Sequence, residues 1–172
     1  MPRAERPRMA AYGVPTDPEG TLPWEWARQR LVRNRNYWVV TASAAGRPHA
    51  LPVWGVWLTG GEAGEGGESF WFSCAPDAQK VRNIRANPQA TVAVEDTVEC
   101  VSVQGRARLA APDEIDPMIA AYLPKYWPDE DAHEQMAAFL RSHAVVALRP
   151  ERAFGIVERE DEFAARATRW VW

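Results

Sequence analysis

The residues best suited to chemistry surround the predicted start of a short helix, in the segment SCAPDAQKVRNI at residues 73–84. Lys80 is one of only two lysines in the chain, and the spacing places it third in a helix with Asp77 as N-cap. A helix N-terminus is partly positive, so a cation there is disfavoured by about 0.3–1 kcal/mol. A bound anion would offset this penalty, and free N–H groups beside an ammonium favour phosphate. Two interpretations stay open: a phosphate site at Lys80, or a solvated basic face shared with Arg82 and Arg85.

Other residue types with chemical potential show weaker patterns. The three histidines lack metal-ligand spacing, and the cysteines Cys74 and Cys100 are too few and too far apart for a zinc site or a disulfide framework. We therefore predict no metal site and expect both cysteines to be packing residues. His49 opens a predicted strand, where it is either a strand-edge residue or a ligand contact.

The elements that must position these residues are mostly strands, which predict an α+β fold: an antiparallel barrel with helices around it. The sequence predicts strands at 37–43, 48–58, 69–74, 89–95, 98–110, 144–150 and 152–158, with a closing segment ATRWVW. It predicts helices at 22–34, 77–88, 112–123 and 129–143. Residues 59–68 are rich in Gly and Glu, which predicts a flexible acidic hairpin loop.

The predicted strand at 48–58 is apolar on both faces. One face carries Leu51, Val53 and Trp57, and the other carries Ala50, Trp54 and Val56. A strand of this kind lies between a barrel interior and a covering element, which is a helix or another subunit.

The helices carry apolar stripes at helical spacing. In the first helix the stripe is Trp24, Ala27 and Leu31. In the last helix it is Ala132, Met136, Phe139 and Leu140. Between the two late helices, residues 122–131 (YLPKYWPDED) form either a lid over a substrate pocket or a plain connection.

Length and composition define one domain, residues 21–172, preceded by an irregular arm at 1–20 rich in proline and charge. A hydrophobic content of 47% and a net charge of −3 are typical of a soluble globular protein and give no reason to expect nucleic acid as the main partner. No apolar run approaches the roughly 18 residues that span a membrane. We expect a cytoplasmic protein. Most of the nine tryptophans are expected in the core, although tryptophan also contacts flat ligands.

Four segments resemble the pyridoxamine 5′-phosphate oxidase-like flavin-binding split-barrel superfamily, nearest to its flavin- and deazaflavin-dependent oxidoreductases. They are NYWVVTASAAGRPHALPVWGVW, FWFSCAPDAQKVRNIRANPQATVAV, VSVQGRARL and ATRWVW, in family order from residue 36 to the end. The resemblance implies a six-stranded split barrel that forms a homodimer, with a flavin-type cofactor in a groove at the dimer interface.

The resemblance also implies roles for individual residues. Pro52, Val53 and Trp54 would run beside the cofactor ring, and Ser73, Cys74, Gln79 and Lys80 would hold its phosphate-bearing chain. Arg106, with Arg47, Arg82 and Arg85, would meet carboxylates of a cofactor tail. Tyr126, Trp127 and Trp170 would line the substrate pocket, with Tyr126 as one source of a proton and solvent as the other. No indispensable catalytic side chain is expected.

Departures from the family pattern narrow the expected cofactor. Where true pyridoxamine phosphate oxidases have phosphate and substrate ligands, this chain has Leu51, Val56, Ala78, Gln79, Cys100, Thr168, Arg169 and Trp170. These changes argue against B6 oxidation and against tight binding of FMN, whose phosphomonoester dianion needs several charge-assisted hydrogen bonds. Coenzyme F-420 carries a phosphodiester with one charge and a glutamate tail, so it is the first choice and FMN the second.

The expected function is therefore oxidoreduction: hydride transfer from the cofactor to a small unsaturated or quinone-like acceptor. Two alternatives stay open. The first is an FMN flavoprotein without B6 oxidase activity, and the second is a non-catalytic protein that binds a cofactor or haem.

Overall fold

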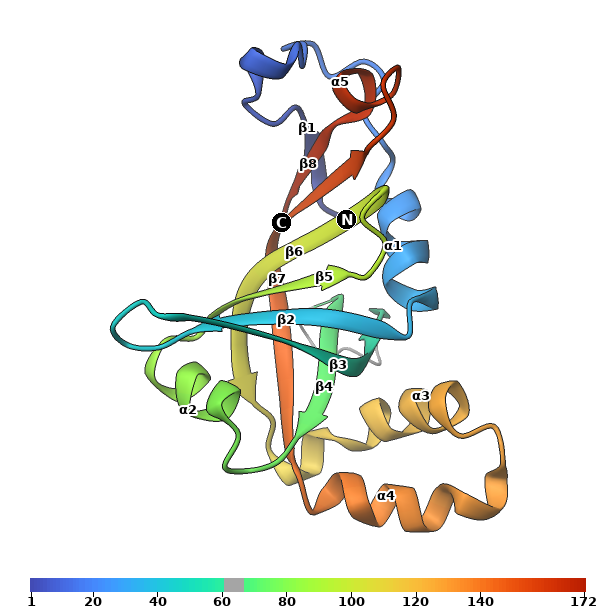
Figure 1. Cartoon of the computed structure of the whole chain (residues 1–172). Helices are drawn as coiled ribbons and strands as arrows, with labels where there is room; N and C mark the ends of the chain where they lie inside the picture. Colours follow the sequence, from blue (N-terminus) through green and yellow to red (C-terminus); the bar gives the residue numbers. More distant parts are fainter. Residues whose placement is uncertain (61–66) are drawn as a thin grey trace.

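The computed structural model describes residues 1–60 and 67–172, and a closed antiparallel barrel forms its centre (Figure 1). Around the barrel the strands follow the order β7 (Ala144–Val157), β4 (Ser69–Cys74), β3 (Pro48–Leu58), β2 (Asn36–Ala42), β5 (Gln89–Val94) and β6 (Glu99–Leu109). Pairing of β6 with β7 closes the circle. This confirms the predicted α+β fold with a six-stranded barrel in the described part of the chain. The predicted loop at 59–68 lies largely outside the described residues.

The longest strand, β7, corrects the prediction of two strands over 144–158. Pro150, which the sequence analysis treats as a strand end, lies opposite Gly105 where the β6–β7 register shifts between Gln104 and Gly105. A proline cannot donate to a strand ladder, but a bulge tolerates it. The strand therefore continues through Pro150 without a break.

The N-terminal arm is not irregular throughout, which also corrects a prediction. Its strand β1 (Arg3–Glu5) pairs with β8 (Thr168–Val171), and β8 pairs with the far end of β7. The arm also contains η1 (Ala10–Tyr12), and α5 (Phe163–Arg166) precedes β8. Both chain ends therefore extend the barrel sheet on one side, where Figure 1 shows N and C close together.

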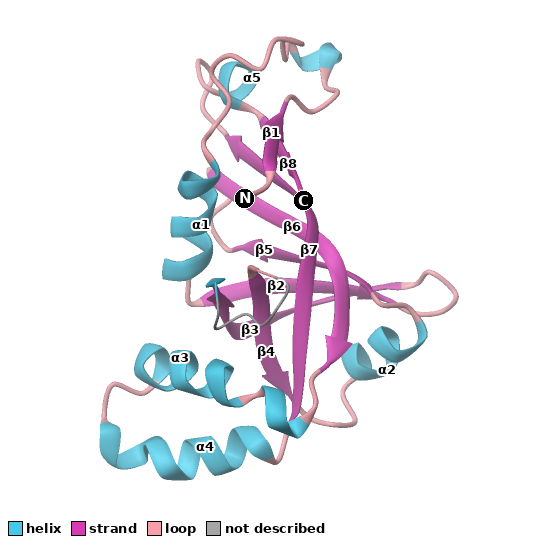
Figure 2. Cartoon of the chain, turned by 180° about the vertical axis from the view of Figure 1, so that it is seen from behind, coloured by secondary structure: helices cyan, strands magenta, loops and turns pink. Residues whose placement is uncertain are grey.

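Helices lie outside the barrel (Figure 2). The helix α1 (Trp24–Arg33) buries the predicted stripe of Trp24, Ala27 and Leu31. The helix α2 (Gln79–Ala86) follows β4. After η3 (Pro112–Glu114), α3 (Asp116–Tyr126) passes beyond its predicted end at 123. The helix α4 (His133–Arg141) follows η4 (Glu130–Ala132).

The predicted stripe of α4 is only partly correct. Leu140 is buried and Met136 packs partly against the same cluster, but Phe139 is half exposed and packs on His143 with ring centroids 4.0 Å apart. The helix α4 contacts this cluster mainly through Leu140 and Met136, so Phe139 faces solvent.

Two hydrophobic clusters lie on opposite sides of the wall formed by β3, β4 and β7. The first fills the barrel and includes Tyr37, Phe70 and Trp170. The second lies outside and joins Trp71 and Val56 on the strands to the helices α3 and α4. Alternation along β3 and β4 sends neighbouring side chains to the two clusters in turn.

Candidate functional site

The candidate site begins where β3 and β4 separate. Their ladder runs from Leu58↔Ser69 to Gly55↔Phe72 and stops there, although β3 extends back to Pro48 and β4 continues to Cys74. We call these unpaired edges, residues 48–54 of β3 and 73–74 of β4, the split. The residues predicted to contact the cofactor ring, Pro52, Val53 and Trp54, lie on one edge of the split, and Ser73 and Cys74 lie on the other.

The residues on the two edges alternate between the barrel interior and its outer surface. Val53 and Cys74 pack against the inner cluster. Trp54 lies on the same face of β3 as Val56, which belongs to the outer cluster, and it is 47% exposed. Ser73 alternates with Cys74 and therefore faces outward. The split thus joins an apolar interior to an aromatic outer surface.

Directly after the split, α2 begins one residue later than predicted. Its N-cap is Ala78 rather than Asp77, and no side chain caps the first N–H groups. Lys80 is therefore the second helical residue. It is only 8% exposed, yet it forms no hydrogen bond or ion pair with any residue that the structure describes. The basic-face interpretation fits Arg82 and Arg85, which are exposed, whereas most of the Lys80 side chain is buried.

Cys74 lies close enough to Lys80 for their charges to interact. Burial raises the pKa of the Cys74 thiol above its usual value, and the Lys80 ammonium opposes that rise. The thiol is therefore the protonated form at neutral pH, as expected of a packing cysteine rather than a nucleophile. Lys80 therefore lies near Cys74, the last residue of β4.

A chain of polar side chains fixes α2 to β2. The Gln79 amide donates to Asn83 Oδ1 (2.8 Å), and the Asn83 amide donates to Thr41 Oγ1 (2.9 Å). Thr41 is the register partner of His49, so the two side chains share the face of the sheet on which α2 docks. His49 Nδ1 is buried there without a hydrogen-bond partner among the described residues. Gln79, predicted as a cofactor ligand, already holds Asn83 and accepts from Arg82.

On the outer side of the split, Trp54 belongs to an aromatic group supplied by the end of α3. Its ring stacks on Tyr126 with centroids 5.0 Å apart and an interplanar angle of 9°. Trp127 meets the Trp54 ring edge-on at 5.8 Å. Residues 122–131 therefore include helix as well as connection, and they bring two predicted substrate residues, Tyr126 and Trp127, beside a predicted cofactor residue.

The Tyr126 hydroxyl is fully engaged with the backbone. It accepts from the Gly55 N–H at 2.9 Å and lies within donating distance of the carbonyl oxygens of Arg35 (2.6 Å) and Gly55 (2.8 Å). Burial raises the pKa of Tyr126 to about 12. These contacts support a structural role and do not support the predicted role as proton source.

Lys125, which the sequence analysis does not assign to the site, lies in the same network. Its amine donates to Tyr37 Oη (2.8 Å) and to the carbonyls of Gly55 (3.0 Å) and Val32 (3.1 Å). Burial, with a smaller effect from the charge of Arg35, lowers the pKa of Lys125 to about 8. The available signal was its rarity, because it is the second of only two lysines.

Two further predicted residues lie away from the split. Trp170 is 0% exposed in the barrel core, where it packs edge-on against Trp24 at 5.4 Å. This position supports a packing role rather than a substrate contact. Arg106 is exposed on β6 between its register partners Gln89 and Arg149. Its contact with a cofactor tail stays a prediction.

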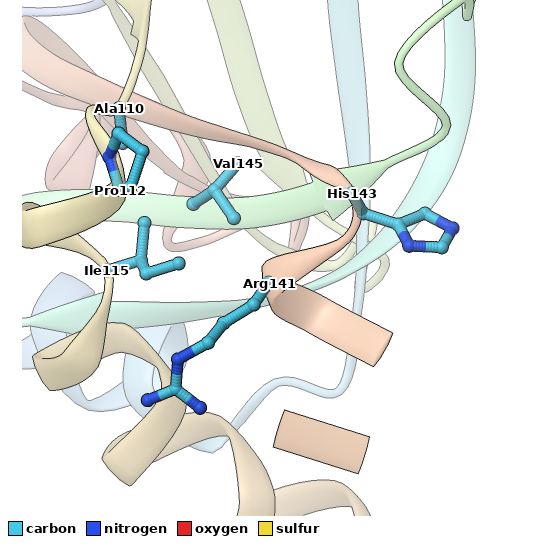
Figure 3. Close-up of a pocket in the computed structure, with 6 residues that line it drawn as sticks. All are labelled: Ala110, Pro112, Ile115, Arg141, His143 and Val145. Atoms are coloured by element: carbon cyan, nitrogen blue, oxygen red, sulfur yellow. The ribbon is translucent and has the colours of Figure 1, made fainter. Parts of the chain in front are cut away.

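A separate small cavity of about 120 Å³ lies between the start of β7 and the start of α3 (Figure 3). It is lined by Ala110, Pro112, Ile115, Arg141, His143 and Val145. Figure 3 shows the His143 ring pointing away from the other labelled side chains, and Arg141 pairs with Asp116 at 2.6 Å. None of the predicted site residues lines this cavity, so we do not assign the site to it.

The described part of the chain holds neither a cluster of metal-ligating side chains nor a membrane-spanning helix. Within residues 1–60 and 67–172, no three His, Cys, Asp or Glu side chains are grouped so that they could hold a metal ion. No helix in these ranges is long and apolar enough to cross a bilayer.

A closed barrel with a split beside a short basic helix defines the class of split-barrel proteins. The sequence profile of the pyridoxamine 5′-phosphate oxidase family matches residues 25–156. The chain belongs to this family. A search of curated proteins found no match.

Solved structures share the fold at low sequence identity. A conserved hypothetical protein from Mycobacterium tuberculosis is 16% identical, with a TM-score of 0.64 over 77% of this chain and 83% of that one. The heme storage protein HutZ from Vibrio cholerae is 20% identical, with a TM-score of 0.55 over 76% and 91%. A protein described as an F420 reductase is 21% identical, with a TM-score of 0.53 over 73% and 94%. At these identities the likeness establishes the fold alone, and the proteins that share this fold include a reductase and a haem protein.

Proposed function

We propose that this protein is an oxidoreductase that binds a flavin-type cofactor at the split, with coenzyme F-420 favoured. In this proposal it transfers hydride to a small unsaturated or quinone-like acceptor. The single observation that carries the proposal is Lys80, a residue only 8% exposed whose ammonium has no partner among the described residues, at the uncapped start of α2. Family membership and the F420 reductase among the structural neighbours support it.

The residues at the start of α2 fit a phosphate group. The first N–H groups of any helix lack intrahelical acceptors, and here no side chain supplies one. The Lys80 ammonium is a second, independent donor at the same place. Asn83 and Thr41 hold the helix against β2, which fixes the direction of these donors. Lys80 would therefore hold the phosphate, with backbone N–H groups beside it.

The sparse set of cations favours a singly charged phosphodiester. Arg82, the nearest arginine in sequence, is exposed and donates to Asp77 O and to Gln79 Oε1. The β3 positions where family oxidases carry basic residues are Leu51 and Val56 in this chain. One buried lysine balances one charge, which suits F-420 better than the dianion of FMN.

The remaining residues would orient the ring and exclude water. When bound, the cofactor supplies the hydride. Val53 on the inner side and Trp54 on the outer side offer apolar surface along the β3 edge of the split. Because the Tyr126 hydroxyl is held by three backbone contacts, solvent is the proposed source of the proton.

A second copy of the chain is the proposed cover for the outer face of β2 and β3. Trp38 and Pro52 are register partners on one face of the sheet, and Asn36 and Trp54 share that face. Trp38 and Trp54 are each 47% exposed, and Pro52 is also exposed. Contiguous exposed aromatic surface of this kind is typical of a protein interface. The first half of β3 is thus open in a single chain, and it would be covered in a homodimer.

The test measures binding of three ligands, F-420, FMN and haem, to the purified protein. Flavin binding is followed by fluorescence and haem binding by its absorption spectrum. We expect F-420 to bind more tightly than FMN, and Lys80→Met to weaken F-420 binding about 10- to 100-fold. The loss of one charge-assisted hydrogen bond, about 1.5–3 kcal/mol, gives this range.

Arg85→Met is the matched control, because it removes the same charge from the exposed last turn of the same helix. We expect it to change F-420 affinity less than threefold. Equal effects of the two substitutions, or no effect of Lys80→Met, would remove the anion site from the proposal. Binding of haem together with the absence of flavin binding would favour the alternative, a non-catalytic haem-binding protein.

A further inference from the structure

The end of α3 is attached to β3 at the residue where the split begins. Gly55 is the last β3 residue paired with β4, and both of its backbone polar groups are bonded to α3 side chains. Its N–H donates to the Tyr126 hydroxyl, and its carbonyl accepts from Lys125 Nζ at 3.0 Å. The next residue along the split, Trp54, has its ring stacked on Tyr126. The position of this exposed indole is therefore set from α3.

Lys125 connects more elements than any other side chain in this network. Besides Gly55, it donates to the Val32 carbonyl on α1 and to the Tyr37 hydroxyl on β2. Its ammonium lies 5.0 Å from the Tyr37 ring centroid and 5.5 Å from that of Tyr126. All three acceptors are neutral, and no carboxylate within the described residues pairs with Lys125.

We propose that Lys125 is a positioning residue that fixes Trp54 at the split, and that loss of its proton loosens this attachment. An ammonium donates three hydrogen bonds, and here three acceptors use them; a neutral amine has only two N–H groups. Charge-assisted hydrogen bonds are also about twice as strong as neutral ones. Deprotonation therefore releases one acceptor and weakens the contact with Gly55.

The charges around Lys125 place this change close to neutral pH. Its surroundings on α1, β2, β3 and α3 contain one cation, Arg35, whose guanidinium lies 5.0 Å from the Tyr126 ring centroid and donates to the Lys125 carbonyl. The carboxylate of Glu95 acts on the neighbouring Tyr37 and accepts a hydrogen bond from the Asn36 amide. Burial and Arg35 both favour the neutral amine, and the pKa of Lys125 is lowered to about 8.

The tyrosines in the network do not titrate in the same range. Burial raises the pKa of Tyr126 to about 12 and raises those of Tyr37 and Tyr122 further. Among Lys125 and these three tyrosines, Lys125 is therefore the group that changes charge between pH 6.5 and 9.5.

The test follows the ring C–H signals of Trp54 by NMR in protein labelled with ¹³C-tryptophan and free of ligand. Trp54→Phe identifies the signal. We expect the Trp54 signal to shift with one midpoint near pH 8. In Lys125→Met this shift should disappear, and in Lys125→Arg the signal should keep its low-pH position up to pH 9.5, because arginine stays protonated.

A Trp54 signal that does not change between pH 6.5 and 9.5, or that titrates unchanged in Lys125→Met, would overturn the proposal. If Lys125→Met does not fold, the Lys125→Arg titration alone decides, because a midpoint near 8 in that variant cannot come from residue 125. The role of Trp54 as a cofactor contact rests on the proposed function, whereas its attachment to α3 does not. The measurement uses no ligand, so failure to bind a flavin would count against the proposed function and not against this inference.

Discussion

Substitution of Gly55 by alanine should open the barrel at the start of the split. A Cβ at this position would lie 2.3 Å and 2.7 Å from two ring atoms of Phe70 and 2.7 Å from the Trp71 carbonyl oxygen. Phe70 is fully buried against Tyr37, with centroids 4.7 Å apart, so its ring has little room to move. Overpacking of this kind costs about 1–3 kcal/mol, and we expect Gly55→Ala to lie near the upper end of this range.

The assay is urea denaturation followed by tryptophan fluorescence, with Phe70→Leu and the double variant completing a thermodynamic cycle. Leucine lacks the two ring atoms that meet the new methyl group, but the contact with the Trp71 carbonyl remains. We expect Phe70→Leu to be destabilising alone because it leaves a cavity. The destabilisation of the double variant should be at least about 1 kcal/mol smaller than the sum of the destabilisations of the two single variants.

Two results would refute this reasoning. A Gly55→Ala variant within about 0.5 kcal/mol of the wild type would show that the strand pair yields without cost. Strict additivity in the cycle would show that the Phe70 ring is not what the methyl group meets.

Three further predictions concern other parts of the fold. Gly105→Ala should cost about 3 kcal/mol, because its Cβ would lie 2.0 Å from the Arg149 carbonyl oxygen; a loss below about 1 kcal/mol in a thermal melt would contradict this. The Lys125 amine has a pKa of 10.5 in the unfolded chain and about 8 in the folded chain, so between these values the unfolded chain binds more protons. The free energy of unfolding of the wild type, measured relative to Lys125→Met, should therefore rise between pH 8 and 10. A difference in urea midpoints that does not change with pH would contradict this prediction. Trp38→Asp should convert a dimer to a monomer in light scattering, and an unchanged mass would exclude this face as the interface.

Most of the barrel could be predicted from the sequence because its strands follow simple rules. The strand at 98–110 alternates strictly, and Val101, Val103 and Ala107 are buried as expected. The strand at 48–58 begins and ends as predicted because a glycine-containing turn precedes it and a glycine-rich loop follows it. Periodicity of this kind depends only on the backbone geometry of a half-buried strand.

The errors come from contacts between segments distant in sequence. Pro150 ends a strand in local terms, but a bulge directly after it, where Glu151 is the extra residue, lets β7 continue. Asp77 is a good N-cap by residue type, yet its backbone carbonyl accepts from Arg82 and the helix begins after Ala78. The residue preferences of caps and turns depend on local sequence alone and therefore cannot predict these contacts.

The site was predictable where its residues adjoin in sequence and unpredictable where two elements meet. Residues 73–80 are contiguous, so their spacing alone predicts Cys74 and Lys80 close to each other, as the structure has them. The role of Lys125 depends on acceptors from three separate elements, one of them the Gly55 carbonyl 70 positions away. Single-sequence reasoning has no means of measuring such a distance.

The separation of the two hydrophobic clusters has a consequence for local opening. The pair α3 and α4 belongs to the outer cluster only, whereas the barrel keeps its own interior even without these helices. Native-state hydrogen exchange should therefore show two cooperative units, with α3 and α4 amides exchanging at a lower free energy than those of β2 and β5. Each such opening would also release the aromatic group from β3, so access to the outer side of the barrel wall would depend on a transient undocking rather than on unfolding.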